Sequence, residues 1–483
     1  MHEPTARHRA RNSPTSGDRK PWTILILLSV AQFMVILDVT VVNVALPSIG
    51  EELGFAAEDL QWVVTAYVLF TGGLLLLGGR MADLLGRRPV FLAGLGIFTG
   101  ASLASGLAPT SEALIGARAA QGLGAAMLSP AALSIITTTY TGAQRTAALS
   151  AWGAIGAGGA AAGVLFGGML TTWLSWEWVF FINVPIGLVT AALAAQVVPS
   201  TRSSAGPLRD LDLPGALAVV AGLVLLVYAV EGTATHGWGS VHTLGLLALS
   251  GGLLSLFAGI ERRARRPLVP TSTWRVRSLV SSGTVMLGAT GLLIGAFFLN
   301  SLFLQGVLGA SALETGVAFL PLVVVIGIAA HLGPHLLAHA GARVVVVVGL
   351  VLIAVGDILL AGAPNDAGYA ADLLPGFLLL GFGVGLTYVA ISVTAMAEVQ
   401  GESAGLASGL MTTAHEIGAA FGVAVFSAIA LGAGVDAAGG AGLVDGYADG
   451  SLAGALIAAV LAIVAVIAVP AIRPTGAQRA AMH

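Results

Sequence analysis

The sequence predicts an all-α membrane protein with fourteen transmembrane helices. Of its 483 residues, 57% are hydrophobic and only 9% are charged. Apolar runs of about twenty residues recur along the chain, and such a run spans the hydrocarbon core of a bilayer when it is helical. The runs cover residues 22–46, 60–79, 89–108, 112–136, 147–170, 179–198, 213–231, 242–260, 278–303, 313–333, 342–362, 373–396, 405–431 and 450–469.

The distribution of charge supports this count. An even number of spans places both termini on one side, and 20 of the 21 Lys and Arg residues fall in the tails and loops of that side. The opposite loops carry Asp and Glu but no Lys or Arg. By the positive-inside rule, both termini face the cytoplasm. The abundance of Arg, Ala and Gly suggests a GC-rich bacterial genome, so we expect a multi-pass protein of a bacterial inner (plasma) membrane.

Two weak internal similarities indicate a repeat. Residues 79–88 are similar to residues 334–343, and Ile155-Gly156 is similar to Ile417-Gly418. Chance similarity between helices rich in Gly and Ala is the alternative. A repeat implies two six-helix halves, with a substrate site at their interface. The expected divisions are a disordered basic tail (1–21), an N-terminal half (22–198), inserted helices 7 and 8 with cytoplasmic loops (199–277), a C-terminal half (278–469) and a C-terminal tail (470–483).

Composition excludes several classes of protein. The chain has no cysteine, which rules out disulfides, thiol catalysis and cysteine-ligated metals. His415-Glu416 lacks the second His of a zinc-protease helix. No set of residues typical of a nucleophile or of phosphate binding is present, and a net charge of −3 gives no indication of nucleic acid as a partner. We therefore expect neither an enzyme nor a protein with a metal or cofactor.

The most specific string, at residues 79–88, joins the second and third spans. Gly79 permits close helix approach, and Asp83 can pair with an Arg or with the start of a helix. Gly86 precedes Arg87 and Arg88, which can bind anionic lipid headgroups. A generic positive loop is the alternative. The string resembles the loop motif G-x-x-x-D-x-x-G-R-R/K of the major facilitator superfamily, which implies a role in conformational change.

The fourth span contains the remaining cation, Arg118. This Arg shares a helix face with Gln121, Gly122 and Ala125. It lies six residues inside the span, where an unpaired Arg costs several kcal/mol. Snorkelling to the interface is the alternative. The string resembles the R-x-x-Q-G-x-G-A motif of the superfamily's proton antiporters.

The first span supplies a candidate partner, Asp38. Asp38 lies about 13 Å below the outer boundary, and Arg118 lies about 9 Å below it, at 1.5 Å per residue. The two side chains can therefore meet, directly or through Gln121 or water. A purely structural Asp is the alternative. The string from Leu37 to Pro47 closely resembles the first-helix motif of the fourteen-spanner drug:proton antiporters.

The fifth span is rich in glycine. Gly159, Gly163, Gly167 and Gly168 are spaced for close helix packing and sliding. Tight packing without a role in gating is the alternative. The run from Gly163 to Gly168 resembles the antiporter motif G-P-x-x-G-G, but Val164 replaces its proline, which puts the local kink of that motif in doubt. The string from Trp176 to Gly187 also looks like this family's junction between spans five and six.

Two further acids lie inside predicted spans. Glu416 is near the middle of span 13, and Asp357 is about five residues from the outer end of span 11. An intramembrane carboxylate indicates a functional site by default. We expect Glu416, Asp357, Asp38 and Gln121 to line a substrate cavity, although Asp357 can instead reach the outer interface.

These resemblances cover all fourteen spans, with the specific strings between residues 37 and 187. They imply a major facilitator fold, alternating access and proton-coupled export of amphipathic, often cationic, drugs or antibiotics by a monomer, with Asp38 and Arg118 coupling protons. A dedicated exporter of one secondary metabolite fits the same motifs. A non-transporting receptor or scaffold would need neither buried charge nor the glycine-rich fifth span.

Overall fold

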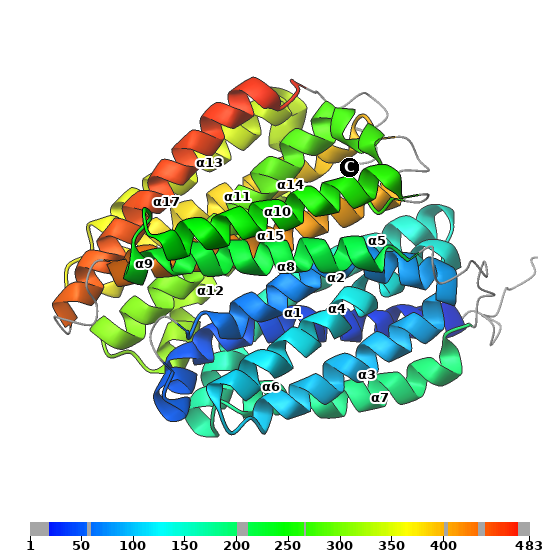
Figure 1. Cartoon of the computed structure of the whole chain (residues 1–483), viewed down its shortest axis with the longest axis horizontal. Coiled ribbons are helices and arrows are strands. Elements are labelled where there is room, and N and C mark those ends of the chain that lie inside the picture. The colour runs from blue at the N-terminus through cyan, green and yellow to red at the C-terminus, as the bar shows by residue number, and fades with distance from the viewer. Residues whose placement is uncertain are drawn as a thin grey trace, which may run out of the picture.

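The computed structural model describes residues 19–55, 59–199, 211–264, 267–399, 404–432 and 440–471. Both predicted tails lie almost entirely outside these ranges. Every regular element within them is a helix, and thirteen helical segments are long and apolar enough to cross a membrane. Helix α5 (Gly142–Trp173) supplies the fourteenth. The predicted all-helical fold with fourteen membrane helices is therefore confirmed (Figure 1).

Six spans form the first half of the molecule, which lies in the lower part of Figure 1. They are α1 (Arg19–Leu53), α2 (Trp62–Leu85), α3 (Arg87–Gly106), α4 (Ser111–Thr139), α5, and the pair α6 (Trp178–Phe181) and α7 (Asn183–Val197). The sixth span is thus divided between a short helix and a longer one.

The second half contains six more spans. They are α11 (Arg277–Leu302), continued by a π-helical turn (Phe303–Val307), α12 (Ala312–Ala340), α13 (Ala342–Ala361), α14 (Leu374–Met396), preceded by a π-helical turn (Tyr369–Leu373), α15 (Ala404–Gly432) and α17 (Gly440–Ala468). Between the halves lie α8 (Leu213–Glu231), α9 (Thr233–His236), α10 (Val241–Arg263) and a 3-10 turn (Thr271–Arg275).

The packing of the first half recurs in the second. Helix α1 packs on α5 as α11 packs on α15, and α4 contacts α2 and α3 as α14 contacts α12 and α13. The junctions that the weak sequence similarity relates also correspond. Gly86 (φ 99°) separates α2 from α3, and Gly341 (φ 83°) separates α12 from α13. Only glycine adopts such positive φ angles without strain, which explains why this residue recurs in both strings.

The inserted helices lie against the outside of the bundle. Helix α10 packs on α8, and α8 contacts α2 of the first half and α15 of the second. Gly73 of α2 makes room for α8, because a Cβ there would lie 2.6 Å from Val220 Cγ2. Figure 1 shows α8 and α10 side by side across one face of the molecule. The insertion therefore covers one of the seams between the two halves.

Helix ends differ from the hydropathy boundaries. Helix α17 begins at Gly440, ten residues before the predicted span 450–469. Helix α1 continues through Pro47 to Leu53, beyond the predicted span 22–46. Hydropathy detects only the apolar part of a helix, whereas the backbone hydrogen bonds continue through the polar turns at the membrane surface.

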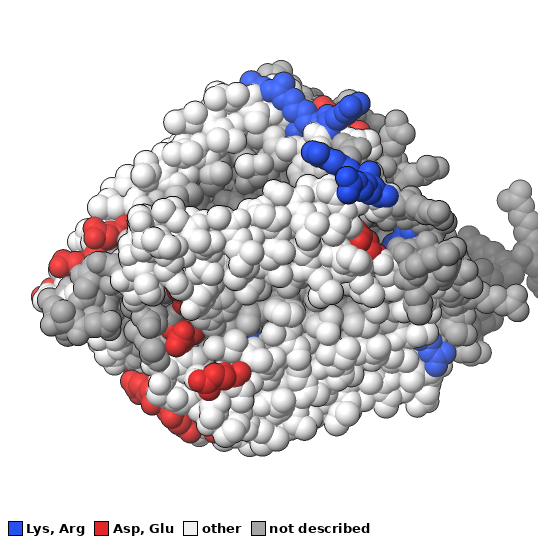
Figure 2. All heavy atoms as spheres, in the orientation of Figure 1, with Lys and Arg blue, Asp and Glu red and all other residues white. Residues whose placement is uncertain are grey.

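The two ends of the molecule carry opposite charge. Figure 2 shows Asp and Glu gathered mainly at the left and lower left, and Lys and Arg mainly at the opposite end. The acidic end includes the exposed Glu51, Glu52 and Asp59, and the basic end includes the exposed Arg262 and Arg263. This arrangement agrees with the segregation of charge in the sequence.

The halves contact each other through α2 against α15 and α5 against α12. Hydrogen bonds join the two halves near the acidic end. They join Ser301 Oγ to the Asn43 carbonyl (3.1 Å), Gln305 Nε2 to the Val44 carbonyl (3.1 Å) and the Leu313 amide to Thr172 Oγ1 (3.1 Å). The halves are therefore closed against each other at that end.

Candidate functional site

Helix α4 is held unusually close to its neighbours. A Cβ at Gly122 would clash with the Tyr67 carbonyl of α2, and a Cβ at Gly124 would lie 2.5 Å from the Phe98 amide of α3. Small residues let membrane helices approach in this way. The contacts fix the rotation of α4, so Arg118 and Gln121 are directed into the first half.

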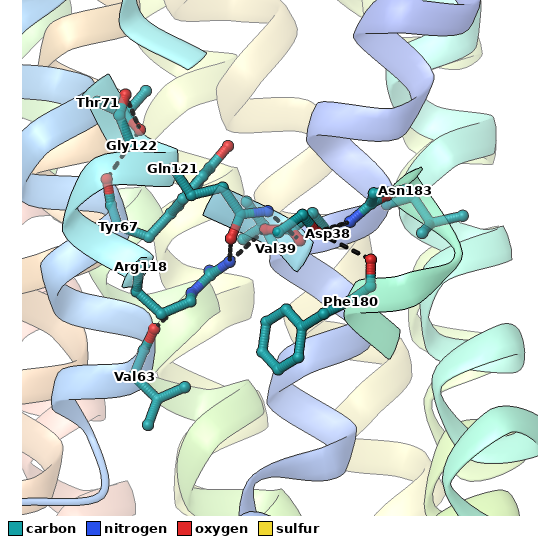
Figure 3. Close-up of polar contacts among 12 residues, drawn as sticks. Asp38, Val39, Val63, Tyr67, Thr71, Arg118, Gln121, Gly122, Phe180 and Asn183 are labelled. Atoms are coloured by element: carbon teal, nitrogen blue, oxygen red, sulfur yellow. Dashed lines mark hydrogen bonds and ion pairs between the residues drawn. The ribbon is translucent and has the colours of Figure 1, made fainter. Parts of the chain in front are cut away.

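Arg118 forms an ion pair with Asp38 of α1. Arg118 Nη1 lies 2.5 Å from Asp38 Oδ2, and both side chains are fully buried. The guanidinium also donates from Nε to the Val63 carbonyl (2.8 Å) and from Nη1 to Gln121 Oε1 (2.8 Å). Its carbon lies 4.4 Å from the centre of the Tyr67 ring, which favours the cation further. Figure 3 shows these groups converging from α1, α2 and α4.

The second carboxylate oxygen of Asp38 accepts two more hydrogen bonds. Gln121 Nε2 donates at 2.7 Å and Asn183 Nδ2 of α7 donates at 2.9 Å. Asn183 Nδ2 also lies 3.1 Å from Ser102 Oγ of α3, which donates to the Phe180 carbonyl at 2.9 Å. We name these residues the Asp38 cluster: Asp38, Arg118, Gln121 and Asn183. The cluster connects α1, α4 and α7.

The predicted meeting of Asp38 and Arg118 is direct, with Gln121 bridging the same two groups. Because Arg118 is fully buried, the alternative that it snorkels to the interface is wrong. Sequence reasoning missed Asn183 as a partner of Asp38, although it noted the string around it. The available signal was an amide side chain between apolar residues, where a membrane offers no water as a partner.

The Asp38 cluster is electrostatically costly. Removing two charges from water costs several kcal/mol per ion, and attraction in the low-dielectric interior offsets this only with good geometry and further hydrogen bonds. Asp38 has three donors, but Arg118 Nη2 and Asn183 Oδ1 have no partner among the described residues. An apolar cluster of similar volume would hold the helices together at lower cost.

The string 79–88, predicted as a loop, lies mostly in the last turns of α2 and behaves partly as expected. Close approach occurs at Gly78 rather than at Gly79, because a Cβ at Gly78 would clash with the Ala126 carbonyl, whereas one at Gly79 would make only an ordinary 3.6 Å contact with Pro130. The prediction for Gly79 is therefore wrong by one residue. A Cβ at position 78 and a Cβ at position 79 would point in different directions around α2. The hydropathy of the sequence does not show which of the two directions faces α4.

The rest of that string lies at the basic end. Gly86 turns the chain between α2 and α3, and Arg88 donates to the Ala195 carbonyl near the end of α7. Arg88 therefore binds a helix end, which carries negative partial charge, rather than only lipid. Arg87 is half-buried and Asp83 is exposed.

The glycines of α5 divide between two partners. Gly159, Gly163 and Gly167 face α1, where added Cβ atoms would meet Ile36, Thr40 and Val41. Gly168 instead faces α12 of the second half, where a Cβ would lie 2.7 Å from the Ala312 carbonyl. Tight packing is thus observed on both sides. With Val164 in place of proline, α5 is assigned as one uninterrupted helix.

Among the described residues, no hydrogen bond or ion pair joins the two other predicted acids to Asp38. Glu416 is half-buried in α15 and lies at the contact between the halves, where its Cβ occupies the space beside Gly72 of α2. Asp357 is 2% exposed inside the second half, next to Gly454 and Phe426. The alternative that Asp357 reaches the outer interface is therefore wrong, and its burial does not support a place on a cavity wall.

A polar cluster in the second half was not predicted. Thr290 Oγ1 of α11 lies 2.8 Å from Tyr388 OH of α14 and 3.0 Å from His415 Nδ1 of α15. Thr290 is fully buried, whereas Tyr388 and His415 are half-buried. Sequence reasoning considered His415 only as part of an incomplete zinc motif. The three residues are far apart in the chain, so no local pattern could connect them.

Comparisons with known proteins agree with this architecture. Residues 28–423 match the model of the Major Facilitator Superfamily. The puromycin resistance protein pur8 of Streptomyces alboniger is 41% identical over 424 residues, covering 86% of this chain and 83% of that protein. The cephamycin export protein CmcT of Amycolatopsis lactamdurans is 39% identical over 426 residues, covering 87% of each.

A solved structure shares the fold. The crystal structure of an auto-inhibited POT family peptide transporter is similar with a TM-score of 0.68 at 15% identity, covering 95% of this chain and 98% of that one. The match to the family model and the two relatives decide the assignment. The chain belongs to the Major Facilitator Superfamily and is a multi-pass membrane transporter, not an enzyme.

Proposed function

We propose that this protein is a proton-coupled exporter of amphipathic drugs or antibiotics in a bacterial plasma membrane. It works as a monomer by alternating access, with both termini in the cytoplasm. The observation that carries the proposal is the fully buried ion pair between Asp38 and Arg118. The names of the two relatives, one a resistance protein and one an export protein, support the direction of transport.

Asp38 is the proposed proton carrier. A proton that binds Asp38 neutralises the carboxylate and removes its attraction to Arg118. Gln121 and Asn183 hydrogen bond the charged form, so protonation also weakens those contacts between helices. The cluster can therefore change its packing between α1, α4 and α7 when it gains or loses one proton.

The proton gradient supplies enough free energy for export. For an uncharged substrate, one proton that moves inward across about 100 mV supplies about 2.3 kcal/mol. Since a tenfold concentration ratio corresponds to about 1.4 kcal/mol, one proton supports more than one decade of substrate gradient. A proton that binds Asp38 from the outside and is released to the inside would couple this free energy to the exit of the substrate.

The closed acidic end supports an assignment of conformational state. By the positive-inside rule the acidic end is extracellular, and the hydrogen bonds between the halves lie there. The described arrangement then corresponds to a state closed to the outside. In the opposite state, these bonds and the contact between Gly168 and α12 would open.

Export is tested in a bacterial host that lacks its own drug pumps. Cells with the wild-type chain should survive higher doses of some members of a panel of toxic compounds, and inverted vesicles should accumulate those compounds when a pH gradient is imposed. Asp38→Asn serves as the matched variant. Resistance that persists without any proton gradient, or no resistance to any compound, contradicts the proposal.

Orientation is tested separately by labelling. Because the chain has no cysteine, Arg263→Cys introduces a single thiol at the basic end of α10. An impermeant maleimide should leave this thiol unlabelled in intact cells and label it after the membrane is permeabilised. Glu52→Cys at the acidic end should already be labelled in intact cells. Labelling of position 263 in intact cells would show that the basic end faces the outside and would contradict the proposed orientation.

A second candidate is a dedicated exporter of one secondary metabolite. The puromycin and cephamycin relatives, each named for a single antibiotic, favour this candidate. The same panel separates the two, since a dedicated exporter protects against one chemical scaffold only. The proton chemistry at Asp38 is the same in both cases.

A further inference from the structure

We propose that Thr290, Tyr388 and His415 form a substrate-binding site that recognises the hydrogen-bonding part of an amphipathic amine, with Glu416 beside it as the counter-ion of the amine. We name the first three residues the Thr290 cluster. The inference rests on the proposed export function and goes beyond it, because it assigns a binding site and a ligand chemistry to the second half.

The hydrogen bonds of the Thr290 cluster orient the imidazole. The Thr290 hydroxyl has one proton, so it can donate to one neighbour while it accepts from the other. Its contacts engage Tyr388 OH (2.8 Å) and His415 Nδ1 (3.0 Å). The rings of Tyr388 and His415 meet edge to face with their centres 5.9 Å apart. These contacts occupy Nδ1 and leave His415 Nε2 without a hydrogen bond among the described residues.

The position of the Thr290 cluster makes the free edge of the His415 imidazole a candidate contact for a substrate. Thr290, Tyr388 and His415 lie near the middle of the long membrane helices α11, α14 and α15. His415 and Tyr388 nevertheless keep accessible surface, since both are half-buried. Glu416, the next residue on α15, is also half-buried and has no ion pair or hydrogen bond among the described residues. Successive side chains on a helix point about 100° apart, so Glu416 faces Gly72 of α2 while His415 faces Thr290 of α11. A cation that reaches both residues would carry its hydrogen-bonding group at a distance from its charge.

A structural explanation competes with this one. Hydrogen bonds between membrane helices can simply hold the helices together. A purely structural cluster would affect all ligands equally when it is broken. A binding site would affect only ligands that use the hydrogen bonds, and the experiment is designed around that difference.

The test measures the affinity of the purified full-length protein for two cations by calorimetric titration. Puromycin has a protonatable amine together with hydroxyl and amide groups, whereas tetraphenylphosphonium is a permanent cation without any hydrogen-bonding group. Tyr388→Phe and Thr290→Val remove cluster hydrogen bonds and nearly preserve side-chain shape. Each should raise the Kd for puromycin about tenfold and leave the Kd for tetraphenylphosphonium unchanged. Glu416→Gln should weaken the binding of both cations.

Tyr369→Phe is the matched control. Tyr369 donates one hydrogen bond to the Ala318 carbonyl elsewhere in the second half, at 2.7 Å. Its loss should change neither affinity. Thermal unfolding of each variant checks that it folds. If Thr290→Val does not fold, the affinities of Tyr388→Phe alone show whether the Thr290 cluster binds the ligand.

Two results overturn the inference. Equal losses for both cations in the cluster variants would assign the Thr290 cluster a structural role, and unchanged puromycin binding would exclude it from the site. Wild-type protein that binds neither cation would overturn the proposed substrate class together with this site. Since binding is measured without a gradient, a failure of proton coupling at Asp38 does not affect the outcome.

Discussion

The two halves share one architecture but treat their buried acids differently. In the first half, Asp38 is fully buried and accepts hydrogen bonds from Arg118, Gln121 and Asn183. In the second half, Glu416 is half-buried and has no such partner among the described residues. The first half therefore encloses Asp38 among donors, whereas the second half carries the half-buried Glu416 besides the enclosed Asp357.

The difference suggests that one acid binds the proton and the other binds the substrate. An enclosed acid with a full set of donors suits a small ligand such as a proton, whose binding changes the contacts between helices. An accessible acid beside aromatic and imidazole groups suits a larger organic cation. Substitutions that affect coupling but not binding, or binding but not coupling, can separate the two roles.

The largest effect is expected for Asp38→Asn. The amide preserves size but cannot carry the proton, so efflux driven by a pH gradient should be abolished. The variant loses the charge partner of Arg118 but should still fold, because the new amide oxygen can accept from Arg118, which also keeps its bonds to Val63 and Gln121. Efflux from vesicles measures the effect, with the exposed Asp366→Asn as a control. Full gradient-driven efflux by Asp38→Asn would remove Asp38 from the coupling role.

Arg118→Ala should affect folding most strongly. It leaves the Asp38 charge buried without its partner and removes the packing against Tyr67. Loss of one member of a buried pair costs about 3–5 kcal/mol. Thermal unfolding in detergent measures this loss. Arg118→Lys keeps the charge but not the planar set of donors and should be intermediate. A melting temperature of Arg118→Ala equal to that of the wild type would show that the pair contributes no stability.

The sequence predicted the Asp38 cluster better than the Thr290 cluster for a physical reason. Arg118 and Asp38 are charged groups within apolar runs, and charge in a membrane requires a partner at similar depth. Depth follows from position along a helix, so the pair could be proposed without knowledge of packing. Asn183, Thr290 and Tyr388 are uncharged, and their partners depend on which helices are neighbours.

Helix rotation limited the prediction in the same way. The periodicity of α4 correctly placed Arg118 and Gln121 on one face, because residues three and four apart share a face of any helix. Nothing in the sequence shows which neighbour that face meets. The assignment of close packing to Gly79 instead of Gly78, and of Asp357 to a cavity or interface, came from this missing information.

Glu416→Gln should reduce the export of cations about tenfold and leave the export of neutral compounds nearly unchanged, since the loss of one favourable charge contact in a partly accessible site is worth about 1–1.5 kcal/mol. Transport of a cationic dye and of a neutral drug is compared in the same vesicles. The exposed Glu52→Gln is the control. Equal losses for both compounds, or no loss for either, would show that Glu416 does not select charge.

Asn183→Leu should weaken coupling about fivefold, which is less than Asp38→Asn. The leucine removes one of three donors to Asp38 and keeps the branched shape of the side chain, and one such hydrogen bond contributes about 1 kcal/mol. Gln121→Leu is the comparison, since it removes the 2.7 Å bond to the same oxygen. The ratio of protons to substrate in vesicles is the measurement. An unchanged ratio in both variants would limit proton coupling to Asp38 and Arg118.

The smallest effect is expected at the closed acidic end, where Gln305→Leu removes the bond to the Val44 carbonyl. Two other hydrogen bonds between the halves remain, at Ser301 and Leu313. The closed state should therefore lose about 0.5–1 kcal/mol, which shifts the ratio of open to closed molecules about threefold.

A thiol reporter measures this shift. Asn43 is 4% exposed, and its carbonyl rather than its side chain accepts the Ser301 bond, so Asn43→Cys preserves that contact. An impermeant maleimide should label this thiol about threefold faster when Gln305→Leu is also present. Gln196→Leu, at a position that bonds only within α7, is the matched control. A labelling rate that is unchanged or lower would mean that the Gln305 bond does not hold the acidic end closed, and that packing of Gly168 against α12 provides the closure instead.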